Sequence, residues 1–188
     1  VIRCLRSRLD AQGWESVLIS VDTRKAAVAK EALDAGADIV NDVSALGDDP
    51  DMAAVAGDRG CIVVLMHKKG VPASMQDAPY YDDCVREVSG YLVEAAARAE
   101  AAGIRHDRII IDPGFGFGKR LEDNLDILSR LDDFVASGYP VLVGLSRKSF
   151  IGAIIDRPAE GRLAGTIAAT VSARERGAAI FRVHDVGE

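Results

Sequence analysis

The sequence contains little cysteine, no long hydrophobic run and no excess of basic residues, and each shortage argues against a class of protein. Its three cysteines are an odd number without close pairing, which favours a reduced, cytoplasmic setting. No apolar stretch is long enough to span a bilayer, and no signal-peptide pattern is present. We therefore expect a cytoplasmic protein that makes no membrane contact.

The charge and the glycine pattern exclude two further groups of proteins. The net charge of −6 argues against a nucleic-acid surface, because phosphate backbones bind basic stripes. Neither a G-x-G-x-x-G fingerprint nor a P-loop is present. With 188 residues, 48% hydrophobic and 28% charged, the chain is long enough for one well-cored domain, and we expect residues 1–188 to form a single domain.

Six short apolar runs dominate the sequence, and each ends at a polar or charged residue. Stretches with helical spacing separate them, so the chain alternates strand and helix, which is typical of a parallel α/β sheet. The carboxyl ends of such strands share one face, where α/β enzymes carry their chemistry. The runs are Val17–Val21, Ala37–Val40, Cys61–Met66, Arg108–Ile111, Pro140–Leu145 and Ala179–Val183.

The intervening stretches predict helices, and most of them are followed by a glycine in the position that commonly ends a helix. These glycines are Gly13, Gly36, Gly60, Gly103, Gly138 and Gly177. The expected helices are Ile2–Gln12, Arg24–Ala35, Asp49–Asp58, Asp82–Ala102, Leu121–Ala136, Ser149–Ile155 and Arg162–Arg176. The stretch from His67 to Tyr81 contains Gly70, Pro72 and Pro79 without periodicity, and we expect it to be a long mobile loop.

Two of the polar stops are poorly explained by structure alone. Lys148 precedes an expected helix, where the helix dipole disfavours a cation. The start of that helix, with the Ser149 hydroxyl and free N–H groups, is suited to an anion. In the last run, alternation places Phe181 and Val183 on one side and Arg182 and His184 on the other. Both stops therefore predict an anionic ligand.

The other stops have structural alternatives. Asp22 precedes an expected helix, so a capping role and a ligand role are equally open, and Asn41 suits a turn equally well. Asp112 follows three isoleucines, and a carboxylate there must find a partner or a ligand. An exposed or supporting position fits His67 better than a catalytic one, and Met66 fits a pocket wall.

A glycine-rich loop follows Asp112. Gly114, Gly116 and Gly118 alternate with Phe115 and Phe117, so the backbone bends sharply there and can approach a ligand closely. The phenylalanines offer aromatic faces, and core packing is an equally good role for one of them.

Taken together, these segments resemble dihydropteroate synthase, a pterin-binding barrel family of folate biosynthesis. The matching segments run in the family's order along almost the whole chain, and those at 112–119 and 144–152 are the most specific. They are Ser20–Thr23, Ile39–Ser44, Leu65–His67 with Ser74–Gln76, Asp112–Lys119, Gly144–Gly152 and Arg182–Asp185.

The resemblance implies a (β/α)₈ TIM barrel and a transferase that joins 6-hydroxymethyl-7,8-dihydropterin pyrophosphate to p-aminobenzoate, releasing pyrophosphate. Lys148, Arg182 and His184 are the implied catalytic residues. The implied substrate-binding residues are Asp22, Asn41, Met66, Asp112, Phe117, Gly144, Lys148, Ser149, Arg182 and His184. A complete barrel needs about 250 residues, so six runs predict an incomplete barrel, about six of eight strands, truncated at both ends.

The resemblance also implies partners. Mg²⁺ is the expected cofactor, although no metal ligand is visible in this chain, because the family's ligand lies in the missing N-terminal part. Sulfonamides are expected to mimic p-aminobenzoate, and the full-length protein is expected to be a homodimer. Two alternatives stay open: a pterin-dependent methyltransferase barrel, which the cationic segments disfavour, and a truncated pterin-binding module without turnover.

Overall fold

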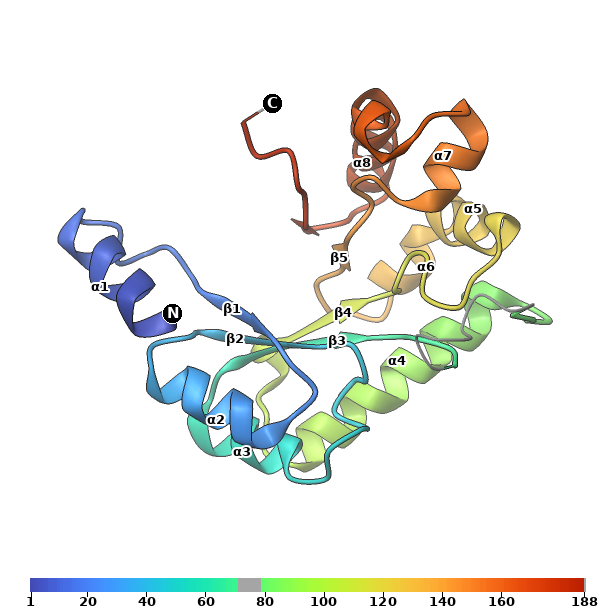
Figure 1. Ribbon diagram of the computed structural model, residues 1–188. Helices are drawn as coiled ribbons and strands as arrows, with labels where there is room; N and C mark the ends of the chain where they lie inside the picture. The colour runs from blue at the N-terminus through green and yellow to red at the C-terminus, as the bar shows by residue number, and fades with distance from the viewer. Residues whose placement is uncertain (71–78, 188) are drawn as a thin grey trace. The chain divides into compact units, whose positions relative to one another are not determined.

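The computed structural model describes residues 1–70 and 79–187, in which six short strands alternate with helices (Figure 1). The chain divides into two compact units, which are described separately. The first contains Val1–Met66 and Glu94–Ile110, and the second contains His67–Val93 and Ile111–Glu188. The division passes through the helix α4 (Cys84–Ala101) and the strand β4 (Ile109–Asp112).

The first unit is built on parallel strands in the order β1, β2, β3 and the first half of β4. β3 and β4 consist mostly of buried aliphatic residues, as in sheets that are covered by helices, whereas β1 has no buried residue. The helices α2 and α3 lie on the same face of the sheet (Figure 1). The elements are α1 (Ile2–Ala11), β1 (Ser20–Asp22), α2 (Ala26–Asp34), β2 (Ile39–Asp42), α3 (Met52–Arg59), β3 (Ile62–Met66) and a 3₁₀ turn (His106–Arg108).

In the first unit, the start of α2 is fixed by side chains that lie before and after it in the sequence. At the start of α2, Thr23 Oγ1 accepts the Lys25 N–H at 3.1 Å, and Asp49 Oδ2 accepts the Ala26 N–H at 2.8 Å. Side chains from before and after the helix therefore share the capping. Within α3, a Cβ on Gly57 would lie 2.8 Å from the Ala102 carbonyl oxygen, so this helix packing requires a glycine.

In the second unit, Ile111 of β4 forms a parallel bridge to Val141, and β5 pairs in parallel with β6. The helices α5, α7 and α8 pack against one another (Figure 1). The elements are α5 (Leu121–Ser129), α6 (Leu131–Val135), β5 (Leu142–Val143), α7 (Ser149–Ile155), a 3₁₀ turn (Ala159–Gly161), α8 (Leu163–Glu175) and β6 (Ile180–Phe181).

The alternation predicted from the sequence is confirmed, and the fold is that of an incomplete (β/α)₈ barrel. All six glycines expected to end helices have positive φ. One expected helix, Leu121–Ala136, is wrong as a continuous element. Arg130 leaves helical geometry at φ −114° and ψ 34°, and its guanidinium binds Asp133 at 2.9 Å and Asp83 at 3.2 Å. A second helix then begins at Leu131.

Candidate functional site

In the first unit, the ends of β1 and β2 bring two of the predicted site residues together. Asp22 and Asn41 are register partners, and the Asn41 side-chain N–H donates to Asp22 Oδ1. Asn41 Oδ1 is buried and accepts no hydrogen bond within the described part of the chain. A buried amide oxygen of this kind suits a ligand N–H. Met66 is 4% exposed at the end of β3.

The neighbouring Asp42 performs the turn role that the sequence left open. Its buried carboxylate accepts the Ser44 N–H at 2.8 Å, the Ser44 hydroxyl at 2.6 Å and the Leu46 N–H at 3.2 Å. Ala45 and Leu46 both have positive φ in this turn. Asp42 therefore shapes the loop, which leaves Asn41 available for a ligand.

In the second unit, Asp112 is a buried carboxylate surrounded by cations. Its Oδ1 accepts the Gly114 N–H at 2.8 Å, and its side chain is shielded from solvent. Burial raises the pKa of Asp112 to about 6, while the Gly114 N–H and the charges of Lys148, Lys119 and Arg182 act in the opposite direction. The carboxylate is therefore ionised at neutral pH and can accept two N–H groups of one ligand.

Lys148 projects from the segment that joins β5 to α7. Its Nζ lies 4.4 Å from the centre of the Phe117 ring, within cation–π range. A Cβ on Gly116 would be in ordinary contact with Lys148 Cδ at 3.5 Å, and the φ of +82° is what favours a glycine at this position. Burial lowers the pKa of Lys148, and Asp112 partly restores it. The buried Phe115 stacks on Phe150 instead, which confirms core packing for one phenylalanine.

The segments after β5 and β6 are tied together. The Arg147 guanidinium donates to both carboxylate oxygens of Asp185, one of them at 3.1 Å, and this ion pair holds the pKa of Asp185 below its usual range. Ser146 Oγ accepts the His184 N–H at 3.2 Å and lies 3.0 Å from His184 Nδ1. These contacts hold the strand ends that carry Lys148 and His184 close together.

The remaining predicted residues lie at the edges of this cluster. Arg182 is exposed, and a Cβ on Gly144 would approach its Cβ to 4.0 Å. Ser149 is exposed and begins α7, as expected. The second unit thus groups Asp112, Phe117 and Lys148 most tightly. The roles assigned to these residues from the sequence stay predictions.

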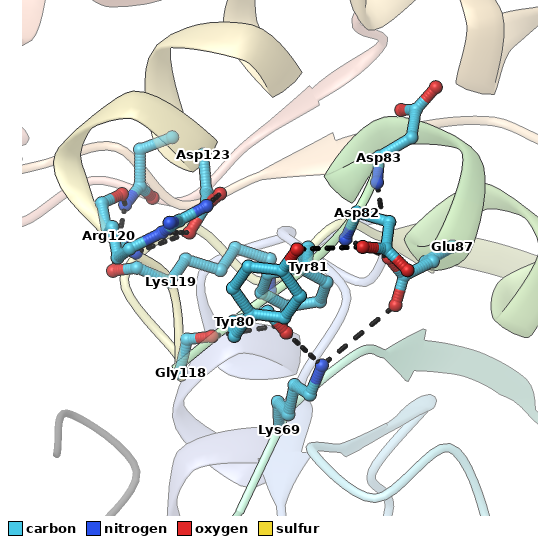
Figure 2. A network of polar contacts seen from close by, with 11 residues as sticks. Lys69, Tyr80, Tyr81, Asp82, Asp83, Glu87, Gly118, Lys119, Arg120 and Asp123 are labelled. Carbon is cyan, nitrogen blue, oxygen red and sulfur yellow. Dashed lines mark hydrogen bonds and ion pairs between the residues drawn. The ribbon is translucent and has the colours of Figure 1, made fainter. Parts of the chain in front are cut away.

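Two buried residues, Lys119 and His67, belong to this cluster although the sequence predicted no ligand role for either. Lys119 is 3% exposed, and its Nζ lies 3.0 Å from His67 Nδ1. His67 is itself 7% exposed and packs edge-on against Tyr91, so an exposed position for it is wrong. Figure 2 shows Lys119 beside Gly118, whose carbonyl accepts the Tyr81 hydroxyl at 2.9 Å. The sequence itself carries no signal that this lysine is buried, because a lysine after a glycine loop usually faces solvent.

Some expectations lie outside the described residues or find no support among them. Residues 74–76 of the matching segments, and the central part of the expected mobile loop, are not described. Within residues 1–70 and 79–187, no group of three or more His, Cys, Asp or Glu side chains could hold a metal ion. None of the helices in these ranges could cross a membrane.

Known proteins resemble this chain along nearly its full length. The Escherichia coli dihydropteroate synthase is 47% identical over 178 residues, which are 95% of this chain and 62% of that protein. The dihydropteroate synthase of Thermus thermophilus, solved with 4-aminobenzoate, superposes with a TM-score of 0.90 at 44% identity, covering 99% of this chain and 69% of that one.

The Xanthomonas albilineans dihydropteroate synthase, solved with 7,8-dihydropteroate, has a TM-score of 0.88 at 45% identity and covers 99% and 66% of the two chains. This chain thus spans less than two thirds of the E. coli protein's length. The family model described as pterin binding enzyme matches residues 1–184. The chain therefore belongs to the family of pterin binding enzymes, and the members that it resembles are dihydropteroate synthases.

Proposed function

We propose that the intact protein condenses 6-hydroxymethyl-7,8-dihydropterin pyrophosphate with p-aminobenzoate to 7,8-dihydropteroate and releases pyrophosphate. The single observation that carries the proposal is the buried, ionised Asp112 beside Lys148 and Phe117. A buried carboxylate with a cation and an aromatic ring near it suits a flat heterocycle with an amino group, a ring N–H and a carbonyl.

The pterin recognition follows from hydrogen-bond chemistry. Asp112 accepts from the amino group and the ring N–H, and Lys148 donates to the carbonyl side. Asp22, Asn41 and Met66 of the first unit stay assigned to pterin contact on the resemblance alone. Charge-assisted bonds of this kind each contribute about 1.5–3 kcal/mol.

Cations at the ends of β5 and β6 favour departure of the pyrophosphate. Lys148 and Arg182 carry positive charge there. His184, which contacts Ser146 after β5, adds a hydrogen-bond donor. Preorganised positive charge stabilises the negative charge that develops on the leaving group, and such stabilisation commonly accounts for most of the rate enhancement. The aniline nitrogen of p-aminobenzoate then captures the pterin methylene carbon, and its proton leaves with solvent.

The p-aminobenzoate site is proposed at the start of α7. Its carboxylate would meet the Ser149 hydroxyl and the free N–H groups there, and its ring would lie against Phe117. Sulfonamides, which share that shape, should compete for the same place. A Ser149→Pro variant removes one N–H, so we expect weaker binding of both compounds. Equal sulfonamide affinity in the variant and the parent would contradict this placement.

The activity test is direct. Supplying both substrates to the intact protein should release pyrophosphate, which a coupled phosphate assay detects. Replacing Lys148 by Ala should weaken pterin binding about tenfold or more, through loss of one charge-assisted bond. A well-folded protein that releases no pyrophosphate, or that transfers a methyl group from a pterin to a corrinoid instead, would overturn the proposal.

Three further expectations belong to the proposal. Mg²⁺ stays an expected cofactor, and no step of the proposed reaction is derived through it, because the described residues include no group of three or more His, Cys, Asp or Glu side chains that could hold a metal ion. The homodimer and the cytoplasmic location also stay predictions. Size-exclusion chromatography with light scattering on the intact protein would decide the first of these two.

A further inference from the structure

Lys119 is a buried ammonium whose hydrogen-bonding capacity is filled. Its Nζ lies 2.9 Å from the Gly114 carbonyl oxygen, 3.3 Å from the Phe117 carbonyl oxygen and 3.0 Å from His67 Nδ1. An ammonium has three N–H donors and no acceptor. The imidazole must therefore accept at Nδ1, which places its proton on Nε2.

These contacts close a ring of bonds around Asp112. The His67 N–H donates to the Asp112 carbonyl oxygen at 3.0 Å, and Asp112 Oδ1 accepts the Gly114 N–H. The Gly114 carbonyl oxygen then accepts from Lys119. The backbone position of Asp112 and the orientation of its carboxylate are thus both linked to one buried cation.

The glycine loop, which ends beside Lys119, also packs against the chain that follows β3. A Cβ on Gly118 would lie 2.2 Å from the Lys69 carbonyl oxygen, so the two backbones touch at this point. Lys69 Nζ lies 4.0 Å from the Tyr81 ring, whose hydroxyl donates to Gly118 (Figure 2). The loop that carries Phe117 is held from both sides.

We propose that Lys119, with His67 as its acceptor, is a positioning residue that fixes the Asp112 carboxylate for pterin binding and keeps it ionised. The inference rests on the proposed function, because it assigns Asp112 to the pterin. Burying a charge is costly unless it is well paired. An apolar side chain would fill this position at lower cost, so the charge itself is what the site uses.

The charged groups around the two residues set the sign of the effect. The cations that act on Asp112 are Lys148, Lys119 and Arg182. Cys84, Asp112 and Asp123 raise the pKa of Lys119, and the positive charge of Lys148 lowers it. The charges of Lys119 and Lys69 lower the pKa of His67. Removing Lys119 takes away one of three positive charges that favour the Asp112 carboxylate. The Asp112 carboxyl should then lose its proton at higher pH.

The first test measures Asp112 without any ligand. Carboxyl-carbon NMR on the intact protein should show the Asp112 titration midpoint about one to two pH units higher in Lys119→Met than in the parent. Lys30→Met, at an exposed position of α2, is the matched control and should leave that midpoint unchanged. An unmoved midpoint in Lys119→Met would overturn the inference.

The second test measures the dissociation constant of 6-hydroxymethyl-7,8-dihydropterin against pH. For a midpoint one to two units higher, the ionised fraction of Asp112 at pH 7 falls about two- to tenfold. Binding to Lys119→Met should weaken by that factor at pH 7 and recover by pH 8.5. A loss that stays the same at both pH values would mean that Lys119 is only structural.

A pair of variants at His67 covers the case in which Lys119→Met fails to fold. His67→Asn keeps an acceptor near the Nδ1 position, and His67→Leu removes it. We expect the Asn variant to bind the pterin within about threefold of the parent and the Leu variant about tenfold more weakly. Equal affinities in the two variants would overturn the role of His67 as acceptor.

The two proposals fail differently. If the parent protein binds no pterin but the Asp112 midpoint still moves in Lys119→Met, the proposed function is wrong and the link between Lys119 and Asp112 stands. If the parent binds pterin but the midpoint and the pH dependence are unchanged, the proposed function stands and the positioning role is wrong.

Discussion

His67 should make the folded protein sensitive to acid, and its neighbours allow the size of the effect to be worked out. Burial, followed by the charges of Lys119 and Lys69, lowers the pKa of His67 from 6.5 to about 3. In the unfolded chain the imidazole takes up a proton near pH 6.5. Between pH 6.5 and about 3, the imidazole is therefore protonated in the unfolded state and neutral in the folded state. The free energy of unfolding falls as the pH falls through this range.

One pKa unit corresponds to 1.36 kcal/mol, so lowering the pH from 6.5 to 4.5 should cost about 2.7 kcal/mol through His67 alone. Asp112 acts in the opposite direction. Its pKa is raised from 3.8 to about 6. The folded protein therefore gains about 2 kcal/mol of stability over the same pH range, because Asp112 takes up a proton in the folded state before it does so in the unfolded state. The contributions of His67 and Asp112 nearly cancel, so the free energy of unfolding of the parent protein should change little over this pH range.

Removing His67 should expose the contribution of Asp112. We expect His67→Asn to become more stable at pH 4.5 than at pH 7 by about 2 kcal/mol, whereas the parent changes by less than about 1 kcal/mol. Urea unfolding of both proteins at the two pH values measures this. NMR of the imidazole in the parent gives an independent reading. Parallel pH profiles for the two proteins, or a His67 resonance that titrates near pH 6.5, would refute the reasoning.

Other substitutions test the glycine loop and the ion pair behind Lys148. Gly118→Ala should lower the free energy of unfolding by more than about 2 kcal/mol in urea titrations, because φ is +65° and the Lys69 carbonyl oxygen blocks the Cβ. Gly138 has φ +88° and open space around it, so Gly138→Ala should lower the free energy of unfolding by only about 1 kcal/mol. Equal losses in the two variants would mean that the contact between Gly118 and the Lys69 carbonyl oxygen adds nothing. Arg147→Lys gives up the two-point contact with its carboxylate partner. Isothermal titration with inorganic pyrophosphate should show about five- to tenfold weaker binding, and unchanged binding would mean that this pair does not position Lys148.

Hydrophobic patterning predicted much of the fold because the strands are short, continuous and buried. Ile109, Ile110 and Ile111 could only be a covered strand, and glycines marked the helix ends. The break at Arg130 could not be read in this way. Leu131 and Phe134 continue the apolar spacing, and the ion pairs that Arg130 makes with Asp133 and Asp83 depend on the folded chain.

Residues of the candidate site could be predicted where a charged side chain stands at a position that folding alone does not explain. Lys148 before a helix and Asp112 after three isoleucines were anomalies in the sequence itself. Lys119 was not, since a lysine after a glycine loop usually faces solvent. Its burial comes from His67 and from the Gly114 and Phe117 carbonyl groups, which meet only in the folded second unit.

The concentration of positive charge around Asp112 has a consequence for anyone who engineers this protein. Three cations face one carboxylate there, so without an anion the folded chain carries unrelieved repulsion. A stabilisation campaign that ranks variants by melting temperature would favour replacing Lys148 or Arg182 with neutral residues, because their removal relieves that repulsion. Under the proposed function such variants would bind the pyrophosphate group more weakly, so selection should be run with pyrophosphate present.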